Sequence, residues 1–221
     1  MAGYAGVGGT LAAGTEGATE LPLPTSLEGA QVQITDSNGK VSLAPLLYVS
    51  AGQINYQVPS SGLAAGLVNV AVLNGTTTVA TGVLELASLA PGIFTANSTG
   101  QGVPAAQIQR VHSDGTYDYE DVFTYDTSTS QFVPSPIAFE GDTLYLLLYG
   151  TGFDSASGAS GTSVTVGTTS TTVLFSGAQG QYAGLDQIVA QLPSSLAGSG
   201  TVTVAATVDQ MTANPVTIAF Q

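Results

Sequence analysis

Polar and apolar residues alternate along much of the chain with a period of two. The clearest stretch is 53–61 (QINYQVPSS), and a second copy occurs at 187–195 (QIVAQLPSS), an offset of 187 − 53 = 134 residues. Such alternation predicts a β-strand with one face buried. The proline near the end of each copy ends the strand, because it has no N–H for the ladder. We therefore expect a duplicated core strand that sets the strand register in two similar domains.

Other apolar positions recur in the same order in both halves of the chain. They fall in short segments separated by turn signals, of which Asn74-Gly75 is a strong hairpin signal. The matched segments are 32–34 with 164–166, 46–48 with 173–175, 53–58 with 187–192 and 68–70 with 202–204. This pattern is typical of antiparallel sandwiches. It predicts an all-β chain built from two tandem immunoglobulin-like antiparallel β-sandwich domains.

The sequence Ala90-Pro91-Gly92 marks the expected boundary between the domains. The prediction is an N-terminal domain over 1–90 and a C-terminal domain over 91–221. The second carries an acidic, tyrosine-rich β insert at about 96–140 with no counterpart in the first half. We expect this insert to form a hairpin with a solvated acidic face and its aromatic side chains turned inward. We also expect a single strand signal over 41–49.

The charge balance excludes several classes of partner. The 221 residues include fifteen Asp and Glu but only two basic residues, Lys40 and Arg110, so the formal net charge is −13. Two basic side chains cannot neutralise many phosphates, which excludes nucleic acid and attachment to anionic lipid through a basic patch. The chain has no cysteine, which excludes disulfides, thiolate metal sites and cysteine nucleophiles.

The composition also bears on location. A cysteine-free, lysine-poor chain rich in Gly, Ser and Thr fits an exported bacterial protein, so we expect an extracellular or cell-surface location. The first residues show no basic and apolar pattern of a secretory signal, and no apolar run is long enough to span a membrane. We therefore expect a mature fragment or a part of a longer polypeptide, with no membrane insertion.

Several motifs together resemble a known domain family. Residues 46–50 (LLYVS) followed by 53–59 (QINYQVP) resemble the Solibacter-type C-terminal domain of large secreted proteins of Acidobacteria. The segments 90–95 (APGIFT), 148–152 (LYGTG) and 184–188 (GLDQI) match it too. The two units also resemble IPT/TIG immunoglobulin-like domains. The resemblance implies an extracellular pair of β-sandwiches without assigned catalytic residues. The shortage of Lys and Arg, and the lack of a large N-terminal partner region, depart from it.

No catalytic constellation emerges from the sequence. The single histidine, His112, lies two residues from Asp114, but no Gly-x-Ser-x-Gly elbow supplies a nucleophile. Gly150-Thr151-Gly152 is too short for a phosphate loop and lacks the lysine. We therefore predict that the protein is not an enzyme and has no catalytic or cofactor-binding residues and no cofactor.

The densest acidic cluster lies in the insert. It comprises Asp118, Glu120, Asp121 and Asp126. Carboxylate oxygens suit calcium, but the spacing is not that of an EF-hand, so no metal ligand is assigned. The neighbouring tyrosines can stack on a sugar; they are Tyr117, Tyr119 and Tyr125. A calcium- or glycan-binding module of a larger secreted protein therefore stays as an alternative function.

The function expected from these observations is that of a non-enzymatic extracellular structural or adhesive module. Its partner is protein, either a second copy or a larger surface protein. The glycine-rich residues 1–20 have no clear place in the first sandwich, and an extended terminal segment can complete the exposed sheet edge of a neighbour. Head-to-tail contacts of that kind make filaments. A subunit of an extracellular filament is thus the more specific hypothesis.

Overall fold

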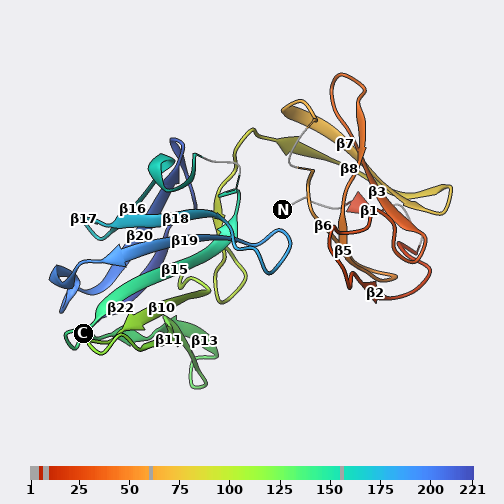
Figure 1. Cartoon of the computed structure of the whole chain (residues 1–221). Helices are drawn as coiled ribbons and strands as arrows, with labels where there is room; N and C mark the ends of the chain where they lie inside the picture. Colours follow the sequence, from red (N-terminus) through yellow and green to blue (C-terminus); the bar gives the residue numbers. More distant parts are fainter. Residues whose placement is uncertain (1–4, 7–9, 60–61, 155–156) are drawn as a thin grey trace. The chain divides into compact units, whose positions relative to one another are not determined.

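Residues 5–6, 10–59, 62–154 and 157–221 are described by a computed structural model (Figure 1). The chain divides into unit 1, Met1–Ser88, and unit 2, Leu89–Gln221. Nearly all described strand pairs in both units are antiparallel, the exception being the short parallel pair of β14 and β22, so the predicted all-β, immunoglobulin-like sandwich fold is confirmed. The helical elements among the described residues are two 3-10 turns, Gly158–Gly161 and Ser194–Leu196. None of the helices in the described part has the length and apolar character needed to cross a membrane.

Unit 1 has two sheets. The five-stranded sheet has the order β1 (Ala5–Gly6), β8 (Thr77–Leu86), β7 (Gly66–Asn74), β3 (Ala30–Thr35) and β4 (Val41–Leu43). The three-stranded sheet has the order β2 (Glu16–Gly17), β5 (Leu46–Val49) and β6 (Ile54–Tyr56). Fully buried side chains such as Val32, Ile34 and Leu46 form the core of the unit.

Two expectations about unit 1 are wrong. The segment 41–49 is not one strand, because β4 and β5 belong to different sheets. Pro45 lies between them, and a residue without an N–H allows the chain to leave one ladder for another. Residues 10–20 do have a place in this unit, since Leu11 is buried in its core and β2 pairs with β5. The rest of the segment expected to lack a place, apart from β1, lies outside the described residues.

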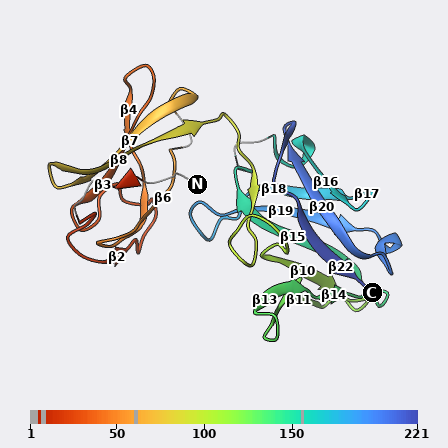
Figure 2. The ribbon, with the colours of Figure 1, turned by 180° about the vertical axis from the view of Figure 1, so that it is seen from behind.

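Unit 2 also has two main sheets. The first has the order β11 (Tyr117–Asp121), β10 (Ala106–Val111), β15 (Thr143–Thr151), β19 (Asp186–Leu192) and β18 (Thr172–Ala178), with β9 (Gly92–Ile93) beside the end of β15. The second has the order β14 (Pro136–Ile137), β22 (Val216–Phe220), β20 (Gly200–Val208), β16 (Thr162–Val166) and β17 (Thr169–Ser170), with β21 (Met211–Thr212) beside β20. Figure 2 shows these strands from behind.

Alternation in the sequence decides which side chains enter the core of unit 2. Leu144, Leu146 and Leu148 of β15 are fully buried between the sheets, as are Ile188 and Ala190 of β19. Their neighbours along each strand face outward because successive side chains point to opposite faces.

The acidic, tyrosine-rich region continues the main sheet of unit 2. Strand β10 pairs with β15 over six residues, and β11 pairs with β10. Only β12 (Phe123–Asp126) and β13 (Gln131–Pro134) form a separate hairpin. Part of the segment expected as an insert thus lies on the outer edge of the immunoglobulin-like sheet.

The two units share a strand order but differ at one edge. The order β8-β7-β3-β4 in unit 1 parallels β22-β20-β16-β17 in unit 2, and the pair β6-β5 parallels β19-β18. In unit 2, β15 covers the other edge of β19. Among the described residues of unit 1, β6 pairs with β5 alone. The duplicated strand is accordingly deeply buried in unit 2 and only half buried in unit 1.

Candidate functional site

The candidate site in unit 2 is built on the hairpin of β10 and β11. Arg110 pairs with Asp118 across the two strands, and Ile108 pairs with Glu120. The tight turn between the strands is closed by Asp114, whose Oδ1 accepts hydrogen bonds from the Thr116 N–H at 2.9 Å and the Thr116 hydroxyl at 2.6 Å. These bonds lower the pKa of Asp114 below its ordinary value. The turn therefore keeps the two strands in register.

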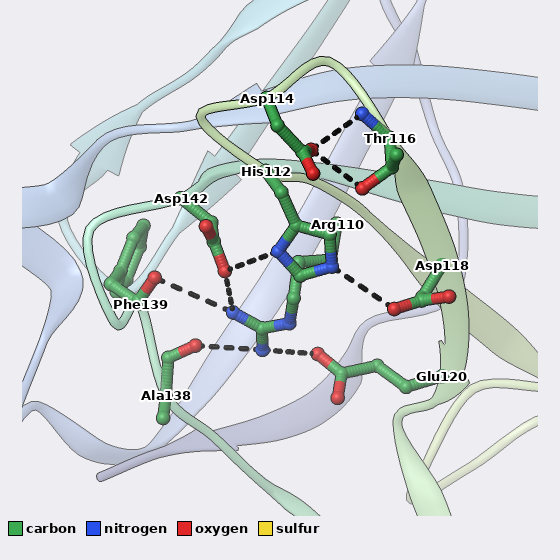
Figure 3. Close-up of polar contacts among 9 residues, drawn as sticks. All are labelled: Arg110, His112, Asp114, Thr116, Asp118, Glu120, Ala138, Phe139 and Asp142. Atoms are coloured by element: carbon green, nitrogen blue, oxygen red, sulfur yellow. Dashed lines mark hydrogen bonds and ion pairs between the residues drawn. The ribbon is translucent and has the colours of Figure 1, made fainter.

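Arg110 ties this hairpin to the loop between β14 and β15 (Figure 3). Nη2 lies 2.6 Å from Glu120 Oε1 and donates to the Ala138 carbonyl at 2.8 Å. Nη1 lies 3.2 Å from Asp142 Oδ2 and donates to the Phe139 carbonyl at 3.4 Å. The residue is only 8% exposed. Burial alone would lower the pKa of Arg110, but the hydrogen bonds that it donates to Glu120 and Asp142 raise it, so the guanidinium stays charged.

His112 lies between two carboxylates. Its Nε2 is 3.0 Å from Asp118 Oδ2, and its Nδ1 is 3.2 Å from Asp142 Oδ2. The contact with Asp118, followed by that with Asp142, raises the pKa of His112 above its ordinary value. Both ring nitrogens face an acid, which leaves neither of them directed at a serine hydroxyl. The ring is thus held between carboxylates and not against a nucleophile, as the base of a catalytic triad would be.

The four acids of the cluster that left calcium binding open as an alternative do not converge. Asp118 contacts His112 and Glu120 contacts Arg110, whereas Asp121 accepts a hydrogen bond from Gln107 Nε2 at 3.1 Å. Asp126 lies in the separate hairpin, where it accepts hydrogen bonds from Ser128 and Thr129. Within the described ranges, no group of three or more His, Asp or Glu side chains is arranged to hold a metal ion.

The expectation that the aromatic side chains of this region turn inward is wrong for its tyrosines, whereas Phe123 packs against the core of unit 2. Tyr117, Tyr119 and Tyr125 are 58%, 52% and 51% exposed. Because Arg110 draws Glu120 toward the inner side of the sheet, strand alternation sends Tyr117 and Tyr119 to the outer face. There the two rings meet edge to face at 5.7 Å, and Gln109 Nε2 donates to the Tyr119 hydroxyl at 3.2 Å.

The sequence interpretation missed the partners of Arg110. It treated the residue only as one of two basic side chains and gave Asp142 no role. The sequence did contain a signal that Arg110 needs partners, because Arg110 continues the series of inward positions begun by Ala106 and Ile108. A charged side chain at an inward position needs a paired acid and further hydrogen-bond acceptors. The identity of those acceptors depends on a loop that the local pattern does not place.

The comparisons with known proteins identify one domain. Residues 128–220 match the family model of the IPT/TIG domain, so an IPT/TIG immunoglobulin-like domain is present in unit 2. The resemblance to IPT/TIG domains is thereby confirmed for residues 128–220. The match covers less than half of the chain. IPT/TIG domains are non-catalytic immunoglobulin-like modules that commonly mediate protein interactions. Comparison with curated proteins and with solved structures found no match.

Proposed function

We propose that this protein is a non-enzymatic extracellular structural or adhesive module that joins other protein by β-strand addition, with a filament of its own copies as the assembled form. The observation that supports this is the unpaired edge of β6 in unit 1. At the corresponding place in unit 2, β15 completes the sheet beside β19. Among the described residues, no strand does so for β6.

The backbone of β6 is oriented for such an addition. The Gln53 carbonyl accepts a hydrogen bond from Ser50, and the Gln57 N–H donates to the Pro45 carbonyl, both at 2.8 Å. In an antiparallel ladder, successive residues direct their backbone groups to opposite edges. The backbone groups of Ile54 and Tyr56 therefore point away from β5. An exposed row of this kind is a template for pairing with another chain.

Three further observations support the proposal. An IPT/TIG domain belongs to a class of modules that commonly bind protein. The resemblance to the Solibacter-type domain of secreted proteins, together with the lysine-poor composition, supports an extracellular location. The histidine is held between Asp118 and Asp142, which supports a non-enzymatic role.

The assembly state is the direct test. The net charge of −13 opposes contact between copies, so assembly is expected to increase with protein concentration and with salt. Light scattering and negative-stain microscopy should show oligomers or filaments at low ionic strength and more of them at about 0.5 M salt. A chain that stays monomeric under all these conditions would refute the filament.

A matched pair of variants tests the edge itself. Ile54→Pro removes an N–H that points away from β5, so it should block addition without breaking a bond of the β5–β6 ladder. Ile54→Val keeps the N–H and serves as the control. We expect assembly to be lost in the first variant and kept in the second. Equal assembly of both would show that the contact lies elsewhere.

A glycan-binding role is the second candidate, because exposed tyrosines lie beside amide side chains on the outer face of unit 2. Tyr119 is bonded to Gln109, and Tyr149 donates to Gln107 Oε1 at 3.2 Å. Aromatic rings and amides are groups that bind sugars by stacking and hydrogen bonding. A glycan array probed with the wild type and with Tyr119→Ala tests it. No retained glycan on the array would remove this candidate.

A further inference from the structure

Unit 1 contains an open apolar groove on the free side of β6. The cavity has a volume of about 210 Å³. Its lining comes from both sheets and from the segment before β2: Leu11, Val32, Gly52, Gln53, Ile54, Tyr56, Val70, Val72, Ala80, Thr81, Gly82 and Val83. None of these side chains is charged. The groove therefore favours an uncharged, apolar occupant.

Unit 2 shows what occupies the corresponding place in a complete sandwich. There β15 pairs with β19 over seven residues, with Leu148 opposite Ile188 and Leu146 opposite Ala190. The offset of 134 residues between the duplicated strands makes Ile54 and Tyr56 the counterparts of Ile188 and Ala190. The inward leucines of β15 are fully buried. A strand seated beside β6 would place its inward side chains in the groove in the same way.

The two units have corresponding hydrogen bonds near the start of the duplicated strand. In unit 2, the N–H of the buried Phe153, two residues after β15, donates at 2.8 Å to Oδ2 of Asp186, the first residue of β19. In unit 1, the N–H of the buried Leu11 donates to the Ala51 carbonyl at 3.1 Å. Ala51 precedes Gly52, which is the counterpart of Asp186. Leu11 thus corresponds to Phe153, and the residues before Leu11 correspond in sequence to β15. In the structure, however, β1 of this segment pairs with β8 and not with β6.

Those residues have the wrong side chains to fill the groove. Residues 1–9 read MAGYAGVGG, with four glycines and no leucine, whereas 143–151 read TLYLLLYGT. A glycine-rich segment buries little apolar surface and loses much conformational freedom when it becomes a strand. A strand with large aliphatic side chains from another chain would therefore fill the groove better.

A second observation points to a missing occupant. The hydroxyl of Tyr56, which lines the groove, is buried and has no hydrogen-bond partner. Buried hydroxyl groups in folded proteins are usually paired, and a strand beside β6 brings backbone carbonyl and N–H groups to this side of the unit.

We infer that this groove binds an extended, uncharged strand of another polypeptide, which carries large aliphatic side chains at alternate positions and lies antiparallel to β6 in the place that β15 has in unit 2. The inference rests on the proposed strand addition and specifies the strand that fits. The free backbone edge supplies the affinity, and the apolar groove selects the side chains.

The binding test uses the full chain and a labelled peptide. The peptide has the sequence of 143–151 and two lysines at one end for solubility; the control peptide carries L144D, L146D and L148D. Fluorescence anisotropy should show saturable binding of the first peptide and binding at least about tenfold weaker for the second. Equal affinity for both peptides, or no binding of the first, would overturn the inference.

A variant of the groove provides the matched control on the protein. A Cβ at Gly52, which lines the groove, meets no atom within 4 Å, so Gly52→Phe places a ring at the groove without a clash of its Cβ. Gly17→Phe adds the same ring in the same unit outside the groove lining, where the nearest atom to the Cβ is the Leu47 carbonyl oxygen at 3.8 Å. Peptide binding should be lost in the first variant and kept in the second. Unchanged binding by Gly52→Phe would contradict the inference.

A variant with a grafted strand tests whether the groove can be filled from within the chain. Residues 1–9 are replaced by the sequence of 143–151, so that the new segment runs into Leu11 as β15 runs toward Phe153. The graft should raise the melting temperature and abolish peptide binding, because the groove is then filled from within the chain. A graft that changes neither would speak against the proposed occupant.

The filament and the inference can fail separately. A chain that is monomeric alone but binds the aliphatic peptide would refute the filament and support a different protein as the strand donor. The opposite outcome is a wild-type chain that does not bind the peptide but forms filaments, and a Gly52→Phe variant that forms them to the same extent. It would support assembly through another surface and overturn the inference.

Discussion

Arg110 Nη2 lies 2.6 Å from Glu120 Oε1, within a hairpin whose acids otherwise face solvent. This contact turns one face of β11 toward the loop before β15 and leaves the tyrosines on the other face. The pair fastens the edge strand β11 to β10, and through Arg110 to the loop before β15.

Replacing Arg110 by methionine should destabilise unit 2. The change leaves the partly buried Ala138 carbonyl without its donor and removes one of two contacts from the Phe139 carbonyl and from the Asp142 carboxylate, which keep the Asp142 N–H and His112. Removing one member of a buried ion pair lowers the free energy of unfolding by about 3 kcal/mol at the lower end of the usual range. We expect this lower value because Glu120 is partly exposed. Urea denaturation measures the loss. Glu120→Gln is the control and should cost less than about 1 kcal/mol.

His112 should titrate above its ordinary pKa, because Asp118 and Asp142 face its ring. As its pKa is higher in the folded than in the unfolded state, the stability it contributes is fully present below the unfolded pKa and is lost as pH rises through the folded value. The melting-temperature difference between wild type and His112→Gln should be larger at about pH 5.5 than at about pH 8.5. NMR of the single imidazole gives the pKa directly. A midpoint at or below the ordinary value would contradict the contact.

Gly150→Ala should disrupt the end of β15. A Cβ at this position would collide with the Gly92 carbonyl oxygen and the ring of the buried Phe153. Overpacking of this kind costs about 3 kcal/mol or prevents folding. Gly17→Ala is the matched control, since its Cβ meets the nearest atom at 3.8 Å. Chemical denaturation of both variants measures the difference, and a Gly150→Ala protein of wild-type stability would show that β9 does not pack against β15 as described.

Tyr56→Phe should be neutral or stabilise the chain by up to about 1 kcal/mol, because the hydroxyl that it removes is buried without a partner. Burial also raises the pKa of Tyr56 above its ordinary value. Differential scanning calorimetry of the isolated chain checks this. A clear loss of stability would mean that the hydroxyl has a partner in solution.

Calcium should not change the stability of the chain. The four acids of the cluster already take part in hydrogen bonds or ion pairs, and Asp126 lies in a different hairpin from Asp118. We expect the same melting temperature in EDTA and in calcium at about millimolar concentration, the range of weak extracellular sites. An increase with calcium would restore the calcium-binding alternative.

The local pattern was sufficient for most of the strands. Alternation located β19 correctly, and Asn74-Gly75 located the β7–β8 hairpin, where Gly75 has a φ of +60°. It also suggested one strand over 41–49, because periodicity does not show where a chain leaves one sheet for another. The same limit applies to Tyr117 and Tyr119, since alternation separates two faces without saying which one is buried.

The sequence by itself determined the all-β class, the duplication and the exclusion of nucleic acid as a partner. Periodicity, repeats and the number of basic side chains can all be read from the chain without its fold. Only the tertiary structure decided that the two copies of the repeated strand differ. Ile188 is covered by β15, whereas Ile54 lines an open groove. That difference depends on which distant segment lies beside each strand, and pairing between distant segments is set by packing across the whole unit, not by the strand's own residues.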